Sequence, residues 1–238
     1  MEHKENAPVF GDDIVSRVAA SAFGIRYLYP MQRLVIANIL DAAGTAADGE
    51  SPAFARQIVL LPTGAGKSFC FLVPALLLDG PTLVVYPLLS LMADQKRKLD
   101  AAGIPCAVLA GGQGREARER EMRRIEDGTA RVIITNPETL RGEQVLARLA
   151  SLGIAHVAVD EAHCVGDWGD SFRPAYLELG RVIDRLRPRV ATAFTATASG
   201  PVLDRMQEVL FGGEAYVVRG DADRPNIRYS VTNCLNKR

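Results

Sequence analysis

The sequence predicts an α/β fold in which helices cover both faces of a parallel β-sheet. Three observations favour this class: short runs rich in β-branched residues recur along the chain, longer segments of helical character separate them, and the two kinds alternate throughout. Such alternation produces parallel strands, because each helix crosses a face of the sheet before the next strand begins. The predicted strands are 57–61, 82–86, 106–110, 131–135, 156–160, 189–195 and 215–218.

The segments between these strands have the length and pattern of helices. They span 67–79, 88–102, 115–127, 137–150, 174–186 and 200–210, and two further helices are expected at 12–22 and 31–43. The stretch GTAADGESPAF, residues 44–54, is small and polar, which predicts a loop. We therefore expect one domain, made of an N-terminal helical segment over 1–45 and a sheet-containing unit over 55–230.

The composition is that of an ordinary globular protein without a dominant charge. The chain has 238 residues, of which 48% are hydrophobic and 24% charged, with 28 basic and 28 acidic residues. A chain with this balance has no overall field that attracts nucleic acid or membrane. Any polyanionic partner would have to be bound by a local patch.

Cysteine spacing and hydropathy point to a cytoplasmic protein. No two cysteines form a Cys-x-x-Cys pair, so we expect no zinc site, and isolated cysteines are typical of a reducing compartment. The start of the chain lacks an apolar signal core, and the longest apolar run, residues 69–78, is too short to span a bilayer. The four cysteines are Cys70, Cys106, Cys164 and Cys234.

A phosphate-binding loop is predicted where the first strand ends. LPTGAGKSF, residues 61–69, lies between an apolar strand and a helix, and its glycines allow the backbone N–H groups to point inward. We expect Lys67 to reach the β- and γ-phosphates of a nucleotide and the Ser68 hydroxyl to ligate Mg²⁺. The strict pattern has glycine where this chain has Leu61, so a chance glycine-rich turn is the alternative. The expected cradle consists of Thr63, Gly64, Ala65, Gly66, Lys67 and Ser68.

Two adjacent carboxylates follow a later strand, in HVAVDEAH at 156–163. Asp160 is placed to hold Mg²⁺ through its water shell, and Glu161 is the candidate base that orients an attacking water. Adjacent side chains on a strand point to opposite faces, so both reach one site only at the strand's carboxyl end, where α/β sheets bind ligands. His163 is either a satisfied core histidine or, directly after the acid pair, a coupling residue.

Several motifs together resemble a known family. LPTGAGKS, PLLSLMADQ, TNPETL, DEAH and FTATAS occur in the order and spacing of superfamily 2 helicases. DEAHCVGDWGDSFRPAY resembles the RecQ family, in which the DEAH box runs into an aromatic-rich loop. FGIRYLYPMQ (23–32) is similar to the adenine motif of that family, and DRPNIRYSV (223–231) to the segment that ends its first RecA-like lobe. The resemblance covers nearly the whole chain.

The resemblance implies a RecA-like P-loop domain that serves as the first motor lobe of a 3′-to-5′ DNA helicase. ATP and Mg²⁺ would be the cofactors, and single-stranded and forked duplex DNA the partners, in the nucleoid. The second RecA-like lobe, which supplies an arginine finger in such motors, is expected to belong to a longer chain. The 238 residues alone would then bind Mg-ATP and single-stranded DNA weakly and unwind nothing.

The resemblance also assigns roles to residues near DNA. Trp168, the only tryptophan, would be a platform on which a base stacks, assisted by Phe172 and Arg173. Ser90 and the start of the helix after Pro87 would contact DNA phosphates through helix-end N–H groups.

Further roles concern the adenine and the coupling between the two sites. Gln32 would hydrogen-bond the adenine edge. Ile25 stands where the family has an aromatic residue and Tyr29 where it usually has arginine, so Tyr27 or Tyr29 would stack on the base instead. His163, Thr195 and Thr197 would link the ATP state to the grip on DNA.

Two other functional classes remain as alternatives. A P-loop enzyme of another kind, such as a small-molecule kinase, would need an acceptor site, and a non-catalytic DNA-binding module would keep only the fold. The Arg- and Glu-rich helix at 115–127 does not by itself indicate a nucleic-acid patch, because its charges fall at i, i+4, as in Glu116–Arg120 and Glu119–Arg123.

Overall fold

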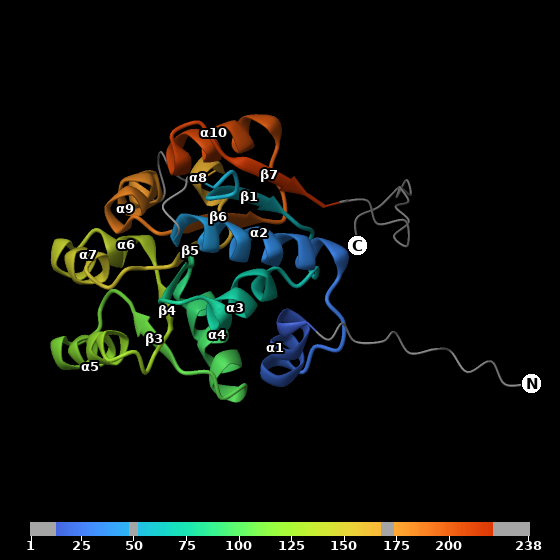
Figure 1. Ribbon diagram of the computed structural model, residues 1–238. Coiled ribbons are helices and arrows are strands. Elements are labelled where there is room, and N and C mark those ends of the chain that lie inside the picture. Colours follow the sequence, from blue (N-terminus) through green and yellow to red (C-terminus); the bar gives the residue numbers. More distant parts are fainter. Residues whose placement is uncertain (1–12, 48–51, 168–173, 221–238) are drawn as a thin grey trace, which may run out of the picture.

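Seven parallel strands form one sheet in the part of the chain that the computed structural model describes, residues 13–47, 52–167 and 174–220. Their order is β3-β4-β2-β5-β6-β1-β7, and helices lie on both sides of the sheet (Figure 1), which confirms the predicted fold class. The strands are β1 (Arg56–Leu60), β2 (Thr82–Val85), β3 (Cys106–Leu109), β4 (Val132–Thr135), β5 (His156–Val159), β6 (Val190–Thr195) and β7 (Tyr216–Arg219).

The helices follow the predicted alternation with some differences in their bounds. They are α1 (Ile14–Phe23), α2 (Pro30–Ala47), α3 (Lys67–Leu77), α4 (Leu89–Ala101), α5 (Arg115–Glu126), α6 (Pro137–Leu140), α7 (Glu143–Ala150), α8 (Cys164–Asp167), the 3₁₀ helix η1 (Pro174–Glu178), α9 (Leu179–Leu186) and α10 (Gly200–Phe211).

The prediction of a loop over 44–54 was wrong for its first four residues, which continue α2 to Ala47. Alanine is the strongest helix former, and the Thr45 hydroxyl donates a hydrogen bond to the Asp41 carbonyl one turn earlier, at 3.0 Å. The segment predicted as one helix over 137–150 is divided into α6 and α7 at Arg141 and Gly142.

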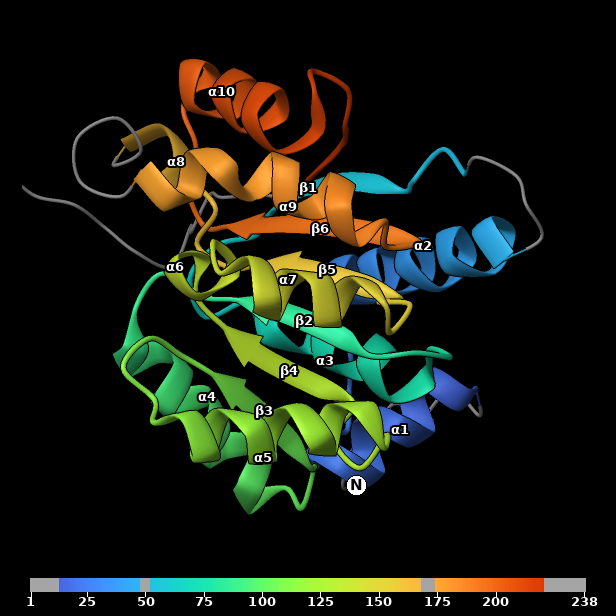
Figure 2. The ribbon, with the colours of Figure 1, turned by 90° about the vertical axis from the view of Figure 1, so that its left-hand side faces the viewer.

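Helices cover both faces of the sheet (Figure 2), and apolar side chains form a layer between the helices and the strands on each face. Residues of α2, α3 and α4 pack against one face, and residues of α5, α7, α9 and α10 pack against the other. The central strands β2, β4, β5 and β6 are buried along their whole length, as expected for a parallel sheet that is covered on both sides. α1 contacts α3 from outside, through Ala19 and Val73.

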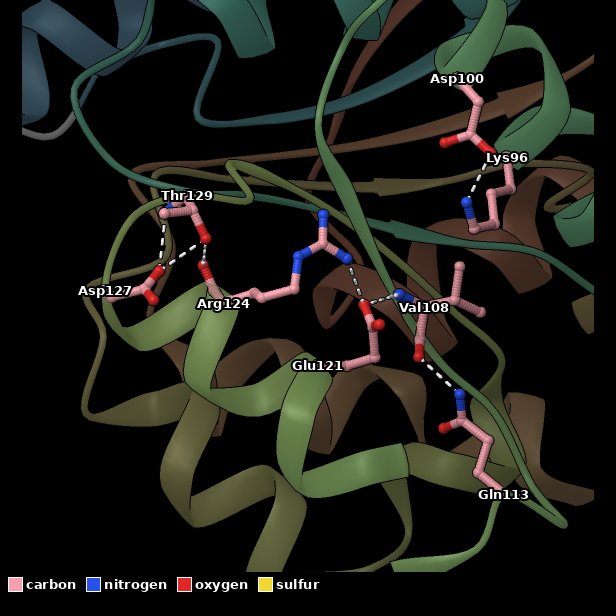
Figure 3. Close-up of polar contacts among 8 residues, drawn as sticks. All are labelled: Lys96, Asp100, Val108, Gln113, Glu121, Arg124, Asp127 and Thr129. Carbon is pink, nitrogen blue, oxygen red and sulfur yellow. Dashed lines mark hydrogen bonds and ion pairs between the residues drawn. The ribbon is translucent and has the colours of Figure 1, made fainter. Parts of the chain in front are cut away.

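Side chains cover the exposed edge of the sheet at β3 (Figure 3). The Val108 N–H donates to Glu121 of α5 at 3.3 Å, and the Val108 carbonyl accepts from Gln113 at 2.8 Å. Arg124 binds the same carboxylate of Glu121 at 2.9 Å. These contacts satisfy groups that would otherwise be open to pairing with another strand.

The charges of α5 pair differently from the predicted i, i+4 pattern. Glu119 binds Arg148 of α7 at 2.8 Å rather than Arg123, and Arg148 also binds Glu126 at 2.8 Å. The helix therefore uses its acidic residues to contact α7. Among the helices of the described residues, none is long and apolar enough to cross a membrane.

Candidate nucleotide-binding site

The predicted phosphate loop connects β1 to α3. Gly64 (φ 83°) and Gly66 (φ 70°) both adopt the left-handed conformation, which glycine accepts without strain. Gly66 is the N-cap of α3, and a Cβ at this position would lie 2.5 Å from Nε2 of Gln32. The backbone conformation favours glycine at position 66, and a Cβ there would also displace the Gln32 amide from the loop.

Gln32 joins the segment before α2 to this loop. Its side chain is 4% exposed, its Nε2 donates to the Ala65 carbonyl at 2.8 Å, and its Oε1 accepts from the Tyr29 N–H at 2.9 Å. The rings of Tyr27 and Tyr29 are exposed and meet edge to face, with centroids 5.7 Å apart. The contact with adenine assigned to these residues stays a prediction.

The acid pair lies where β5 ends, as predicted, and the chain turns sharply there. Glu161 has a φ of 48°, in the left-handed region, and its N–H donates to Oδ1 of Asp160 at 3.0 Å. A positive φ is uncommon outside glycine, so the surrounding structure holds this turn in place. Because of it, both carboxylates reach the same cleft.

The electrostatic environment of Asp160 favours a cation beside it. Burial, and next the negative charge of Glu161, raises the pKa of Asp160 from 3.8 to about 6. The Glu161 N–H and the charge of Lys67 act in the opposite direction and do not cancel the effect. A carboxylate with a raised pKa gains stability when a metal ion neutralises its charge.

These groups line one cleft, with a volume of 760 Å³. Lys67 and Ser68 come from the start of α3, Asp160 and Glu161 from the end of β5, and Gln95 from α4. The Nζ of Lys67 donates to the Leu61 carbonyl at 3.4 Å. The sequence-predicted catalytic and metal-binding residues are thereby brought together.

The proposed coupling residues lie next to this cleft and contact one another. The Thr195 hydroxyl donates to the Thr197 carbonyl at 2.9 Å and lies 3.0 Å from Nδ1 of His163. Since the hydroxyl proton is directed at Thr197, it is Nδ1 of His163 that donates to Thr195. His163 Nδ1 also lies 3.4 Å from Oε2 of Glu161. A chain of contacts thus runs from Glu161 through His163 to the end of β6.

The described part of the predicted DNA-binding surface is the start of α4. Ser90 is exposed there, and the N-cap residue Leu88 makes no side-chain hydrogen bond to the first turn. Leu89 is also exposed. Trp168, Phe172 and Arg173 lie outside the described residues.

Gln95 was not predicted as a site residue, because the motif PLLSLMADQ was interpreted only through Ser90 and the helix start. The missed signal was a glutamine between Met92 and Leu99, at positions where an amphipathic helix has apolar residues.

Comparisons with known proteins agree with this geometry. Residues 29–206 match the family described as DEAD/DEAH box helicase. The probable ATP-dependent DNA helicase RecS of Bacillus subtilis is 38% identical over 215 residues, which cover 90% of this chain and 40% of that protein. The ATP-dependent DNA helicase RecQ of Pasteurella multocida is 35% identical over 175 residues, 74% of this chain and 28% of that protein.

Solved structures share the fold at lower sequence identity. A hypothetical ATP-dependent RNA helicase from Sulfolobus tokodaii has a TM-score of 0.61 at 18% identity, over 86% of this chain and 56% of that chain. The DUF1998 helicase MrfA, bound to DNA and AMPPNP, has a TM-score of 0.61 at 21% identity, over 92% of this chain and 32% of that chain. The chain therefore belongs to the DEAD/DEAH box helicase family, as a RecA-like lobe related to the RecQ and RecS helicases.

Proposed function

We propose that this chain is the ATP-binding motor lobe of a RecQ-type 3′-to-5′ DNA helicase, which couples ATP hydrolysis to movement along single-stranded DNA. The observation that carries the proposal is the single cleft shared by Lys67, Ser68, Asp160 and Glu161, with His163 and Thr195 in contact behind it. The family uses ATP, and the relatives are named ATP-dependent DNA helicases.

The residues of the cleft fit a magnesium ion bound with the nucleotide. Asp160, whose pKa is raised by burial, and the Ser68 hydroxyl would hold the ion, which would supply positive charge that neutralises the phosphates of the nucleotide. The N–H groups of the loop and Lys67 bind the phosphates, and Glu161 orients the attacking water. A γ-phosphate would compete with the Leu61 carbonyl for the Lys67 amine.

The partner that we propose is single-stranded DNA, next to a fork in the duplex. Ser90 and the start of α4, which has no side-chain cap, offer hydrogen-bond donors to phosphates, while Trp168, assisted by Phe172 and Arg173, would stack on a base. Stacking on an aromatic ring contributes about 1–3 kcal/mol per base and tolerates any sequence. The setting would be the nucleoid, in repair and recombination.

Unwinding needs more than this lobe. The chain spans 40% of RecS and 28% of RecQ among the relatives named above, and we propose that a second RecA-like lobe closes the nucleotide site with an arginine finger. The 238 residues by themselves bind Mg-ATP and single-stranded DNA weakly, in a salt-dependent manner, and do not separate strands.

Nucleotide binding with and without DNA tests this function. The dissociation constant of a non-hydrolysable ATP analogue with Mg²⁺ is measured by calorimetry for the wild type and Lys67→Ala, each with and without oligo(dT). We expect wild-type binding to change with DNA and Lys67→Ala to bind at least tenfold more weakly. Nucleotide binding that ignores DNA at low salt would favour a P-loop enzyme of another kind, and strand separation by these 238 residues would overturn the two-lobe requirement.

A further inference from the structure

Gln95 is a polar residue in the apolar stripe of a helix. On α4, Met92 and Leu99 face the core and are 2% and 1% exposed, and Gln95, between them, is 6% exposed. Its side-chain amide has no hydrogen-bond partner among the described residues. The polar atoms of this amide are not among the fully buried atoms that lack a partner, so they reach the open cleft, where a water or a ligand can bind them.

The amide of Gln95 faces the nucleotide cleft. Gln95 lines this cleft together with Lys67, Ser68 and Asp160. It does not hydrogen-bond Asp160 directly: among the described residues, the Asp160 carboxylate accepts a hydrogen bond from the N–H of Glu161 alone. Both side chains line the cleft without a direct hydrogen bond between them, and a bound water is the group that bridges such polar atoms.

A second unused hydrogen-bonding group lies beside Asp160. Tyr86 follows β2 and Asp160 follows β5, where Val85 and Val159 are register partners, so the two side chains extend from neighbouring strands. Tyr86 belongs to the same core layer as Ala158, two residues before Asp160, so alternation directs both side chains to this layer. The Tyr86 hydroxyl is buried without a hydrogen-bond partner. Burial, and next the charge of Asp160, raises its pKa.

The Gln95 amide and the Tyr86 hydroxyl are hydrogen-bonding groups of the kind that surround metal sites. Carboxylates and waters that surround a metal ion are oriented by outer hydrogen-bonding partners, and removal of one such partner typically weakens metal binding about 10- to 100-fold. We propose that Gln95 is a positioning residue of the metal–nucleotide site: its amide binds a water ligand of the Mg²⁺ that Asp160 and Ser68 hold. The inference rests on the proposed function, and it gives α4 a role in the nucleotide site beyond its contact with DNA.

The position of Gln95 on α4 has a further consequence. Ser90, five residues earlier, lies at the DNA-facing start of the same helix, about 7.5 Å away along the axis. A movement of α4 on binding DNA would displace the Gln95 amide relative to the metal. Loss of the Gln95 amide should therefore reduce two effects on nucleotide affinity, that of bound DNA and that of Mg²⁺.

The test compares Gln95→Met, which keeps the length and packing of the side chain, with Gln144→Met, an exposed glutamine of α7, as the control. The dissociation constant of a non-hydrolysable ATP analogue is measured in Mg²⁺ and in EDTA, and thermal unfolding is followed without nucleotide. We expect Gln95→Met to weaken binding about tenfold in Mg²⁺ and not in EDTA. The melting temperature should be unchanged or raised, and Gln144→Met should behave as the wild type.

The possible results distinguish the role of Gln95 from the proposed nucleotide-binding function. Equal weakening in Mg²⁺ and EDTA, or no weakening in either, would overturn the role of Gln95 while wild-type binding still supports the nucleotide site. Absence of binding by the wild type under both conditions would instead contradict the proposed function, and the inference with it.

Discussion

Replacement of Asp160 with asparagine should stabilise the nucleotide-free protein at neutral pH and abolish its response to Mg²⁺. In the folded protein the pKa of this carboxyl group is raised from 3.8 to about 6, first by burial and then by the charge of Glu161. Each pKa unit corresponds to about 1.4 kcal/mol, so ionisation of Asp160 opposes folding by about 2–3 kcal/mol above pH 6. A neutral asparagine of similar size removes this term.

The sign of the pH dependence follows from the raised pKa. The favourable contribution of protonated Asp160 is fully present below pH 3.8 and is lost as the pH rises through about 6. Urea unfolding of the wild type and of Asp160→Asn should therefore give similar stabilities near pH 4 and a gap of about 2 kcal/mol in favour of the variant at pH 7.5. Asp204→Asn, an exposed acid on α10, serves as the control.

Asp160→Asn has a second, independent readout. Mg²⁺ with an ATP analogue should raise the melting temperature of the wild type and not of the variant, because binding to the native state stabilises it by mass action. A stability difference that does not change with pH, or a variant that is less stable than the wild type at pH 7.5, would contradict an energetic cost of burying the charge of Asp160.

Three further substitutions test other parts of the site. Gly66→Ala should destabilise the protein by about 1–3 kcal/mol in chemical unfolding, because φ is 70° and the new Cβ would lie 2.5 Å from Gln32; a variant as stable as the wild type would contradict this. Tyr86→Phe should leave the nucleotide-free protein equally stable or more stable by up to about 1 kcal/mol in thermal unfolding, because the lost hydroxyl has no partner, whereas a lower stability would reveal one. Thr195→Val should remove the contact with His163, and with it the effect of single-stranded DNA on nucleotide affinity. The nucleotide affinity without DNA should be retained. Calorimetry of the variant with and without DNA measures both affinities.

The features that were predictable from sequence are those with a local signal. The apolar run 156–160 predicted β5 within one residue, because a strand buried on both faces has few polar positions. The glycines at 64 and 66 predicted the phosphate loop, since glycines between an apolar strand and a helix are typical of such loops. The placement of Asp160 and Glu161 followed from the end of the strand.

The features that were not predictable depend on contacts between distant segments. The hydrogen bond from Gln32 to Ala65 spans 33 residues, and that from His163 to Thr195 spans 32. No local pattern distinguishes such partners from other polar residues. The turn at Glu161, with its φ of 48°, and the exposure of Gln95 to the cleft likewise arise only when the strands and helices are packed.

Communication between the nucleotide cleft and a bound DNA strand is tested most directly by the fluorescence of Trp168, the only tryptophan in the chain, during titration with single-stranded DNA. The titration is done with and without a Mg-bound ATP analogue, and with Lys67→Ala as the control. We expect DNA to quench the fluorescence, and the midpoint of the titration to shift with nucleotide in the wild type and not in Lys67→Ala. Fluorescence that does not respond to DNA while the nucleotide still binds would contradict a lobe in which this cleft and a bound DNA strand influence each other.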